Sequence, residues 1–355
     1  MAVRGFVYGG YEHVTPARLQ DCDEYDPSTN TWTSKADMPT PARRYLAAST
    51  IGSKGYIYGG NSDDAYLQDC DEYDPSTNTW TSKADMPTPA RNHLAASTIG
   101  DKGYVYGGEG SAGRLADCDE FDPSTNTWTS KADMSPARRG SAASTVSDKG
   151  YVYGGSASTG FIRDCDEYDP STNTWTSKAD MPTPGREYFA GSAISSKAYG
   201  YGGYSADGWL QDCDEYDPST NTWTSKADMP TPARNGLAAS TINSKGYVYG
   251  GWDGSNDLAD CDEYDPSTNT WTSKADMPTP ARQFLAASTI EYVVVTTYNT
   301  MKGGPTSWVW SAIQYGGTDK CPRGSPTSWE WEVPVEGGPE MTPQGGPTSW
   351  NWGPE

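Results

Sequence analysis

Histidine is almost absent from this chain, and basic residues are few. His13 and His93 are the only histidines in 355 residues, and 26 Lys and Arg stand against 47 Asp and Glu, which gives a formal net charge of -21. Copper sites depend on imidazole ligands, so we expect no copper chemistry, no metal site and no cofactor. Nucleic-acid binding requires neutralisation of phosphates, so we expect no nucleic-acid partner for this acidic chain.

Long apolar runs are missing as well. No stretch reaches the roughly 20 apolar residues that a membrane-spanning helix needs. The first residues, MAVRGFVYGG, contain no signal-peptide core and no lipidation motif. For the sequence as given, we expect no membrane insertion and a cytoplasmic or virion-associated location, unless a leader is missing.

Cysteine is scarce and regularly placed. Repeat-equivalent cysteines are expected to lie farther apart than the roughly 7 Å Cα limit for a disulfide. They are therefore predicted to be buried free thiols, which favours a reducing compartment. The six regular positions are Cys22, Cys70, Cys118, Cys165, Cys213 and Cys261, while Cys321 stands alone near the C-terminus.

Repetition is what the chain has in excess. The stretch DCDEYDPSTNTWTSKADMPTPAR is written six times with few changes, and a fixed period of this length indicates a solenoid, a propeller or an array. Within each copy, β-branched and aromatic runs alternate with turn residues, which predicts four short antiparallel strands: LAASTI, GYVYGG, DCDEYD and TWTSK. The copies begin at Asp21, Asp69, Asp117, Asp164, Asp212 and Asp260, a period of 48 with one of 47 at Ser135.

Each copy resembles the kelch repeat. The marks of that family are a Gly pair after the second strand, a Tyr in the third and a Trp in the fourth, here Gly59-Gly60, Tyr73 and Trp80. Phe121 is the only change at the Tyr position, and the resemblance covers residues 5–290. It implies an all-β fold, a six-bladed kelch-type β-propeller of four-stranded antiparallel blades with one blade per repeat.

The ends of the repeat region predict how the ring closes. The first copy enters at its second strand, Phe6 to Gly10, and the last first-type strand, residues 285–290, has no partner after it. We therefore expect strand 285–290 to complete the first blade, which removes free sheet edges. Residues 1–290 are predicted to form the propeller and residues 291–355 a separate tail.

The tail has its own repeat, G-[GS]-P-T-S-W-x-W, written three times with a period of 21 residues. Its units are too short to own a core, so we expect a docking or assembly tail that contacts another protein chain. An intramolecular clasp and a disordered segment are the alternatives. The tryptophans of this assembly tail are Trp308, Trp310, Trp329, Trp331, Trp350 and Trp352.

The copies differ from one another in two places that antiparallel strands bring to one end of each blade. Loops on a rigid scaffold commonly carry binding residues, so this end is the predicted ligand-binding face; drift in exposed loops is the alternative. One place is the loop between the second and third strands, residues 11–20, 61–68, 109–116, 156–163, 204–211 and 252–259, which include Tyr204, Trp209 and Trp252. The other is the residue pair before each first strand: Arg44-Tyr45, Asn92-His93, Arg139-Gly140, Glu187-Tyr188, Asn235-Gly236 and Gln283-Phe284.

One constant arginine per copy precedes each of these variable pairs. A ring of guanidinium groups would grip carboxylates, phosphates or sulfates, and some members of the kelch family are similar in binding acidic peptides this way. The alternative is that each arginine pairs with an aspartate of its own or a neighbouring blade. The six are Arg43, Arg91, Arg138, Arg186, Arg234 and Arg282.

Catalysis is not expected from these residues. Asp26, Ser28 and Asn30 imitate the start of a calcium loop but lack its later Gly and Glu, so a backbone-bonded turn is favoured. The only unusual acids or bases of the variable face are Glu12, His93, Glu187 and Asp253. We therefore predict a non-enzymatic propeller that binds a protein or glycan. The alternatives are a component decorating a virion or extracellular filament, and a carbohydrate-active enzyme of the kelch kind.

Overall fold

The chain folds into β-strands joined by turns. The structure, a computed structural model, describes residues 1–63 and 65–293 and, as backbone alone, six strands between residues 297 and 354. Two compact units divide the chain, residues 3–291 and residues 292–355 together with Met1 and Ala2. Among the described residues, no helix is long and apolar enough to span a membrane.

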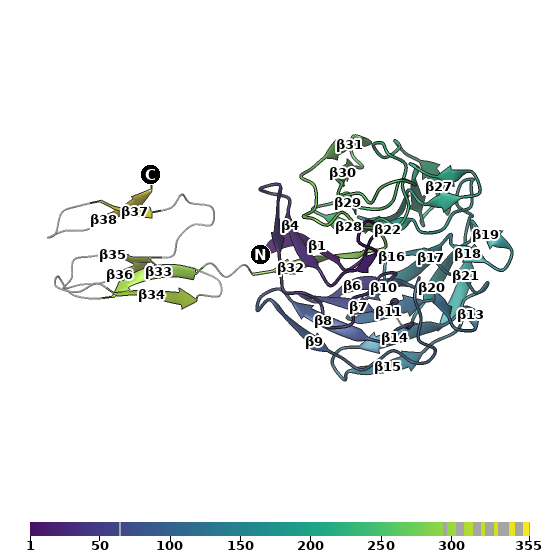
Figure 1. Cartoon of the computed structure of the whole chain (residues 1–355), viewed down its shortest axis with the longest axis horizontal. Coiled ribbons are helices and arrows are strands. Elements are labelled where there is room, and N and C mark those ends of the chain that lie inside the picture. Colours follow the sequence, from purple (N-terminus) through teal and green to yellow (C-terminus); the bar gives the residue numbers. More distant parts are fainter. Residues whose placement is uncertain are drawn as a thin grey trace. The chain divides into compact units, whose positions relative to one another are not determined.

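Six four-stranded antiparallel sheets form the first unit and stand as blades around one axis (Figure 1). This confirms the predicted six-bladed propeller. The innermost strands are β6 (Ala47–Ile51), β10 (Ala95–Ile99), β16 (Ala142–Val146), β22 (Ala190–Ile194), β28 (Ala238–Ile242) and β32 (Ala286–Tyr292). The second strands are β1 (Ala2–Tyr8), β7 (Lys54–Tyr58), β11 (Lys102–Tyr106), β17 (Lys149–Tyr153), β23 (Lys197–Tyr201) and β29 (Lys245–Tyr249).

The third and fourth strands of every blade come from the part of the repeat that is nearly constant. The third strands are β4 (Cys22–Asp26), β8 (Cys70–Asp74), β14 (Cys118–Asp122), β20 (Cys165–Asp169), β26 (Cys213–Asp217) and β30 (Cys261–Asp265). The outermost strands are β5 (Thr31–Ser34), β9 (Thr79–Ser82), β15 (Thr127–Ser130), β21 (Thr174–Ser177), β27 (Thr222–Ser225) and β31 (Thr270–Ser273).

Blade one joins the two ends of the propeller. Its strand order is β32-β1-β4-β5, so the strand latest in the sequence lies beside the first, as Figure 1 shows by the green β32 next to the purple β1. This confirms the predicted closure. Because β32 pairs with β1, the edge of β1 that faces the axis is covered, as in the other blades.

Small extra hairpins extend four of the loops between second and third strands. The sequence predicted variable loops there but no regular structure. The pairs are β2 (Tyr11–Glu12) with β3 (Ala17–Arg18), β12 (Glu109–Gly110) with β13 (Gly113–Arg114), β18 (Ser156–Ala157) with β19 (Gly160–Phe161), and β24 (Tyr204–Ser205) with β25 (Gly208–Trp209).

The second unit contains three antiparallel hairpins with one register. Met301, Pro322 and Pro343 face Trp310, Trp331 and Trp352, so the 21-residue sequence repeat is also a structural repeat. Trp308, Trp329 and Trp350 lie outside the described residues. The strands are β33 (Thr297–Lys302), β34 (Val309–Gln314), β35 (Cys321–Arg323), β36 (Glu330–Glu332), β37 (Met341–Gln344) and β38 (Asn351–Pro354).

The core of the propeller lies between blades. Tyr58 and Cys70 of blade two pack with Val105 and Phe121 of blade three, and all four are at most 1% exposed. The Trp128 ring of blade three meets Tyr58 edge-on at 5.8 Å between centroids. The family's Tyr and Trp marks are therefore packing residues that join neighbouring sheets.

A second contact between blades, here called the interblade latch, explains the constant Asn-Thr-Trp sequence. The Ala36 N–H of blade one donates to Asn78 Oδ1 of blade two at 2.9 Å, and Trp80 Nε1 donates to the Ala36 carbonyl at 2.8 Å. Tyr73 also donates its O–H to Asn78 Oδ1, at 2.8 Å. The same latch closes the ring, where Trp32 Nε1 donates to the Ala275 carbonyl at 2.8 Å.

The Gly pair is needed where the second strand ends. Gly59 and Gly60 have φ of +55° and +107°, which an L side chain rarely adopts. A Cβ on Gly59 would also lie 2.6 Å from the Arg91 carbonyl oxygen. The chain can therefore turn out of the strand and pass under the connection to the next blade only with glycine at this place.

Candidate functional site

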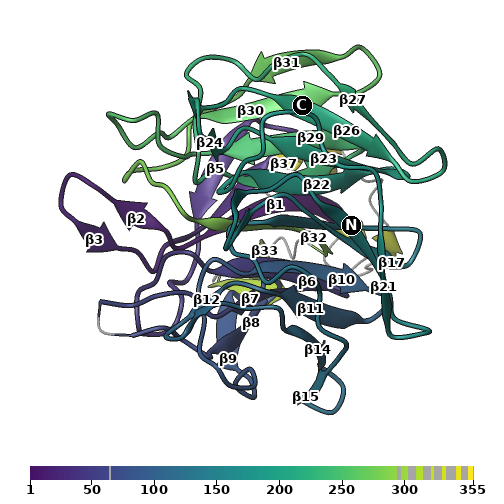
Figure 2. The same cartoon turned by 90° about the vertical axis from the view of Figure 1, so that its right-hand side faces the viewer.

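The blade-specific residues meet at one end of the propeller, here called the variable face. Six backbone bridges tie the connection before each innermost strand to the loop after a second strand, and Figure 2 shows β2, β3, β12 and β24 on one side of the ring. The structure thus brings together the segments that differ between copies. The bridged pairs are Arg44–Asn61, Asn92–Glu109, Arg139–Ser156, Glu187–Tyr204, Asn235–Trp252 and Gln283–Tyr11.

A circle of backbone hydrogen bonds, the backbone ring, lies next to these bridges. Each member donates its N–H to the carbonyl of the corresponding residue of the preceding blade, and all six have φ between +52° and +63°. The six bonds fix the central backbone of the variable face. They are Tyr45 to Phe284 (3.0 Å), Phe284 to Gly236 (2.6 Å), Gly236 to Tyr188 (2.8 Å), Tyr188 to Gly140 (2.9 Å), Gly140 to His93 (2.9 Å) and His93 to Tyr45 (3.0 Å).

Four aromatic side chains of this ring form an aromatic cap: Tyr45, Tyr188 and Phe284, which are half-buried, and His93, whose side chain is 8% exposed. The Tyr45 centroid lies 3.7 Å from that of His93 and 4.2 Å from that of Phe284. Tyr188 lies 5.1 Å from His93 and 5.5 Å from Phe284. The cap is therefore one continuous group of rings in mutual contact rather than four separate rings.

The two glycines of the backbone ring make room for the cap. A Cβ on Gly140 would lie 3.1 Å from the Tyr188 ring, and one on Gly236 would lie 2.8 Å from the Phe284 ring. For Tyr188 and Phe284, the large ring in one blade therefore depends on glycine at the same position of the preceding blade.

Two arginines flank the aromatic cap in different ways. Arg44 lies over Tyr11 and Tyr45, with its guanidinium carbon 4.4 Å and 4.7 Å from the ring centroids. Arg139 pairs with Glu109 and, at 3.4 Å, with Glu187. Arg44 is therefore held by rings, whereas Arg139 joins two carboxylates.

The buried titratable groups of this face are His93 and Glu187. Burial and the nearby charges of Arg139 and Arg44 lower the pKa of His93 well below its usual value, so the imidazole is neutral at pH 7. Its Nδ1 lies 2.7 Å from Asn92 Oδ1. Burial raises the pKa of Glu187, although Arg139 opposes that effect. Among the described residues, no hydrogen bond or ion pair is found between His93 or Glu187 and Glu12 or Asp253. The four residues therefore do not make up one acid–base site.

Tyr204, Trp209 and Trp252 lie at the periphery of the variable face. The Tyr204 and Trp209 rings are 5.3 Å apart, and the Trp252 ring lies 4.8 Å from His13. The sequence analysis did not single out Tyr11, whose ring lies against the Arg44 guanidinium group. The signal available for it was its place in the variable loop 11–20.

The six constant arginines are inside the protein. Each is at most 1% exposed and forms an ion pair with a buried aspartate of the third strand. Intramolecular pairing, the alternative weighed from the sequence, is therefore what the structure contains, and none of these guanidinium groups faces solvent. The pairs are Arg43–Asp71, Arg91–Asp119, Arg138–Asp166, Arg186–Asp214, Arg234–Asp262 and Arg282–Asp23.

The six regular cysteines are also internal. Each is 1% exposed and free, as predicted for buried thiols. Burial raises their pKa, which keeps them as unreactive thiols at neutral pH. Side-chain contacts of Cys321 lie outside the described residues.

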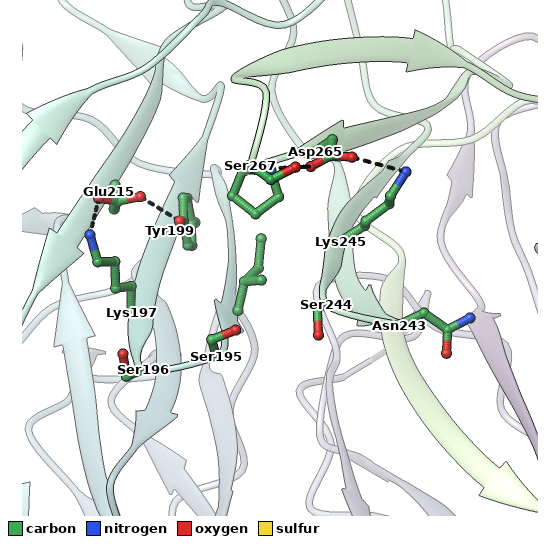
Figure 3. A pocket seen from close by; sticks show the side chains of 12 residues that line it. Ser195, Ser196, Lys197, Tyr199, Glu215, Asn243, Ser244, Lys245, Asp265 and Ser267 are labelled. Atoms are coloured by element: carbon green, nitrogen blue, oxygen red, sulfur yellow. Dashed lines mark hydrogen bonds and ion pairs between the residues drawn. The ribbon is translucent and has the colours of Figure 1, made fainter.

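The opposite end, the second face, carries grooves between blades. One of about 510 Å³ lies between blades five and six (Figure 3). Its acids and bases pair with each other: Lys197 donates to Glu215 at 2.6 Å, and Lys245 lies 3.2 Å from Asp265. A groove between blades three and four repeats the Lys, Tyr and Glu positions, with Asp101 and Asp148 in place of Ser196 and Ser244.

The Asp-x-Ser-x-Asn segments of the second face are turns. Asp265 Oδ1 accepts hydrogen bonds from the Ser267 O–H at 2.6 Å and the Ser267 N–H at 2.9 Å, which lower its pKa to about 2. Asn269 takes the left-handed conformation and binds Tyr264. Across the described part of the chain, no three His, Cys, Asp or Glu are grouped to hold a metal ion.

Comparisons with known proteins agree with this architecture. The solved structure of YjhT is 18% identical, with a TM-score of 0.62 over 72% of this chain and 91% of its own, a likeness that concerns the fold. Among curated proteins, none matches this chain. The KLHDC2/KLHL20/DRC7 Kelch-repeats domain matches residues 3–135 and 130–304, which confirms the resemblance seen in the repeats. Since these matches span most of the sequence, the chain belongs to the kelch-repeat domain family.

Proposed function

We propose that this propeller is a non-enzymatic module that binds a partner protein through its variable face. The observation that carries the proposal is the aromatic cap, which is built only from positions where the six copies differ. A continuous group of aromatic rings flanked by Arg44 and Arg139 has the composition of a binding hot spot. Kelch propellers generally serve protein interaction, which supports the same conclusion.

The backbone ring offers a clean variant for testing the proposal. Tyr45→Gly with Tyr188→Gly removes two cap rings but keeps a residue type that the ring already contains at Gly140 and Gly236. Peptides selected from a displayed random 12-residue library would be measured against the wild type and this variant. We expect about a 30-fold loss or more, the effect of a hot spot worth about 2 kcal/mol.

The matched control changes the second face. Thr77→Ala with Thr172→Ala removes exposed hydroxyls from two turns without touching the cap. Selected peptides that lose affinity for this control but not for the cap variant would overturn the proposal. If the protein binds only glycans on an array, the variable face remains the binding site but the partner is a glycan rather than a protein. Turnover on a panel of sugars would favour the enzyme alternative.

We further propose that the tail serves docking or assembly with another protein chain. The support is the common register of its three hairpins, which presents the same short unit three times. A chain ending at Val293 keeps all of β32 and therefore the closed propeller. We expect it to retain peptide binding and to lose assembly in sedimentation measurements; unchanged assembly would refute the tail's role. A structural role in a virion or filament would appear as assembly without any peptide binding.

A further inference from the structure

Two exposed apolar side chains bracket the loop of blade six on the variable face. Val14 is 83% exposed and Trp209 is 40% exposed. Trp209 lies against the blade-six loop, since a Cβ on Gly254 would be 2.8 Å from its ring. From the other side, the His13 N–H donates to Asp257 Oδ2 at 2.5 Å. Blades five, six and one thus share one surface, here called the Trp252 sector.

Carboxylates without a cationic partner surround these side chains. Glu12, Asp207, Asp253 and Asp257 form no ion pair with Lys or Arg in the described part of the chain. On the neighbouring loop of blade two, by contrast, Asp63 forms an ion pair with Arg18. The Trp252 sector therefore carries uncompensated negative charge on an already acidic protein.

A buried acceptor without a donor lies beside Trp252. Asn235 is 8% exposed, and its Oδ1 has no hydrogen-bond partner. Its backbone bonds Trp252 in both directions, at 3.1 Å and 2.8 Å, so the amide is fixed next to the sector. An unpartnered carbonyl oxygen adds negative potential where the carboxylates already act, which favours a positively charged or N–H-rich occupant.

We propose that the Trp252 sector docks a cationic segment of a partner protein, with an arginine or lysine over the Trp252 or Trp209 ring and ion-paired with Asp207 or Asp253. The proposal rests on the variable face being a protein-binding surface and adds the chemistry of the partner. Indole faces attract cations, and Arg does so most often. Uncompensated acids on the rim would steer such a segment toward the rings.

The test uses three fluorescein-labelled nonapeptides that share a glycine and serine background and one leucine. They differ in one pair of residues, which is two arginines, two lysines or two glutamates. The sector variant is Glu12→Gln with Asp207→Asn and Asp253→Asn, which keeps the acceptor oxygens that bind Thr15, Ser255 and Asn256. The matched control, Asp37→Asn with Asp85→Asn and Asp133→Asn, removes the same charge from exposed positions elsewhere. Anisotropy at low salt would give the affinities.

We expect the arginine peptide to bind most tightly and the glutamate peptide least. The sector variant should weaken the arginine peptide about tenfold, and Trp209→Ala a further several-fold, while the control changes it less than threefold. Equal losses in the sector variant and the control would mean general attraction to an acidic protein and would overturn the proposal. Circular dichroism of each variant checks that the fold is kept.

The peptide-library selection distinguishes failure of the cationic-partner proposal from failure of the proposed protein-binding function. If the selected peptides require the aromatic cap but contain no Lys or Arg, the proposed binding function is supported and the proposed cationic partner is refuted. If no selected peptide depends on the variable face, both proposals fail. Enrichment of Arg or Lys together with dependence on Asp207 and Asp253 supports both.

Discussion

The buried arginine–aspartate pairs allow a quantitative prediction at Arg43. Arg43 is fully buried and pairs with Asp71, whose side chain is 3% exposed. Arg43→Met removes the cation and leaves the carboxylate buried without compensation. Breaking one partner of a buried pair costs about 3–5 kcal/mol. For a domain of this size, about 1.5–2 °C of melting temperature corresponds to each kcal/mol, so we expect a decrease of about 5–10 °C.

An exposed pair of the same chemistry is the matched control. Arg163 lies 3.5 Å from Asp180, and their side chains are 40% and 52% exposed. Arg163→Met should therefore cost about 0–1 kcal/mol. Scanning calorimetry of both variants at pH 7 measures the difference. Equal melting temperatures for the two variants would refute the reasoning that burial decides the cost.

A double variant separates the charge from the packing. Arg43→Met with Asp71→Leu removes both charges, and replacing a buried pair by apolar side chains is often neutral or stabilising. We expect it to recover most of the stability lost by Arg43→Met alone. A double variant as unstable as the single one would show that the loss comes from packing around the arginine rather than from the unpaired carboxylate.

Three further predictions concern the ring, the latch and the cap. A chain ended at Leu285 lacks β32 and should lose cooperative unfolding by calorimetry, in contrast to a chain ended at Val293; similar melting of the two would contradict closure by β32. Trp80→Phe replaces the indole by a smaller ring and deletes the bond to Ala36, so in denaturant unfolding it should cost about 1 kcal/mol for the bond plus a cost for lost packing. Asn78→Ala deletes two bonds and should cost about 2 kcal/mol; a cost near zero would count against the latch. His93 has a folded-state pKa below its unfolded value near 6.5, so its contribution to stability is present above that pH and lost as pH falls, by up to about 1.4 kcal/mol per pH unit. Wild type should therefore lose more stability than His93→Phe between pH 7 and 5, and parallel curves would show that His93 is protonated equally in both states.

Much of the fold could be predicted from the sequence because six copies of one repeat show the same pattern of strands and turns. The turns and alternating strands predicted the four-stranded unit, the six copies together with the kelch resemblance implied six blades, and the unpaired strand 285–290 indicated how the ring closes. The short hairpins β2–β3 and β24–β25 did not follow, since two-residue strands carry no periodicity above that of a loop.

The site was predicted in outline rather than in detail. Comparing the copies placed Tyr45, His93 and Tyr188 at one end, but not in mutual contact, because the backbone ring that orients them depends on neighbouring blades. The position of Arg43 was equally uncertain from sequence. Its aspartate partner is 28 residues away, and only packing shows that the pair is shut off from water.

The interblade latch has a consequence for how such a chain can grow. Ala36, Asn78 and Trp80 have counterparts in all six repeats, so the surface that one sheet offers its neighbour is the same wherever it stands in the ring. Duplicating a whole 48-residue unit therefore creates a junction that already fits, while the loops at the variable face are free to diverge. Exchanging loops 204–211 and 252–259 between blades would then change what the molecule recognises while every latch remains intact.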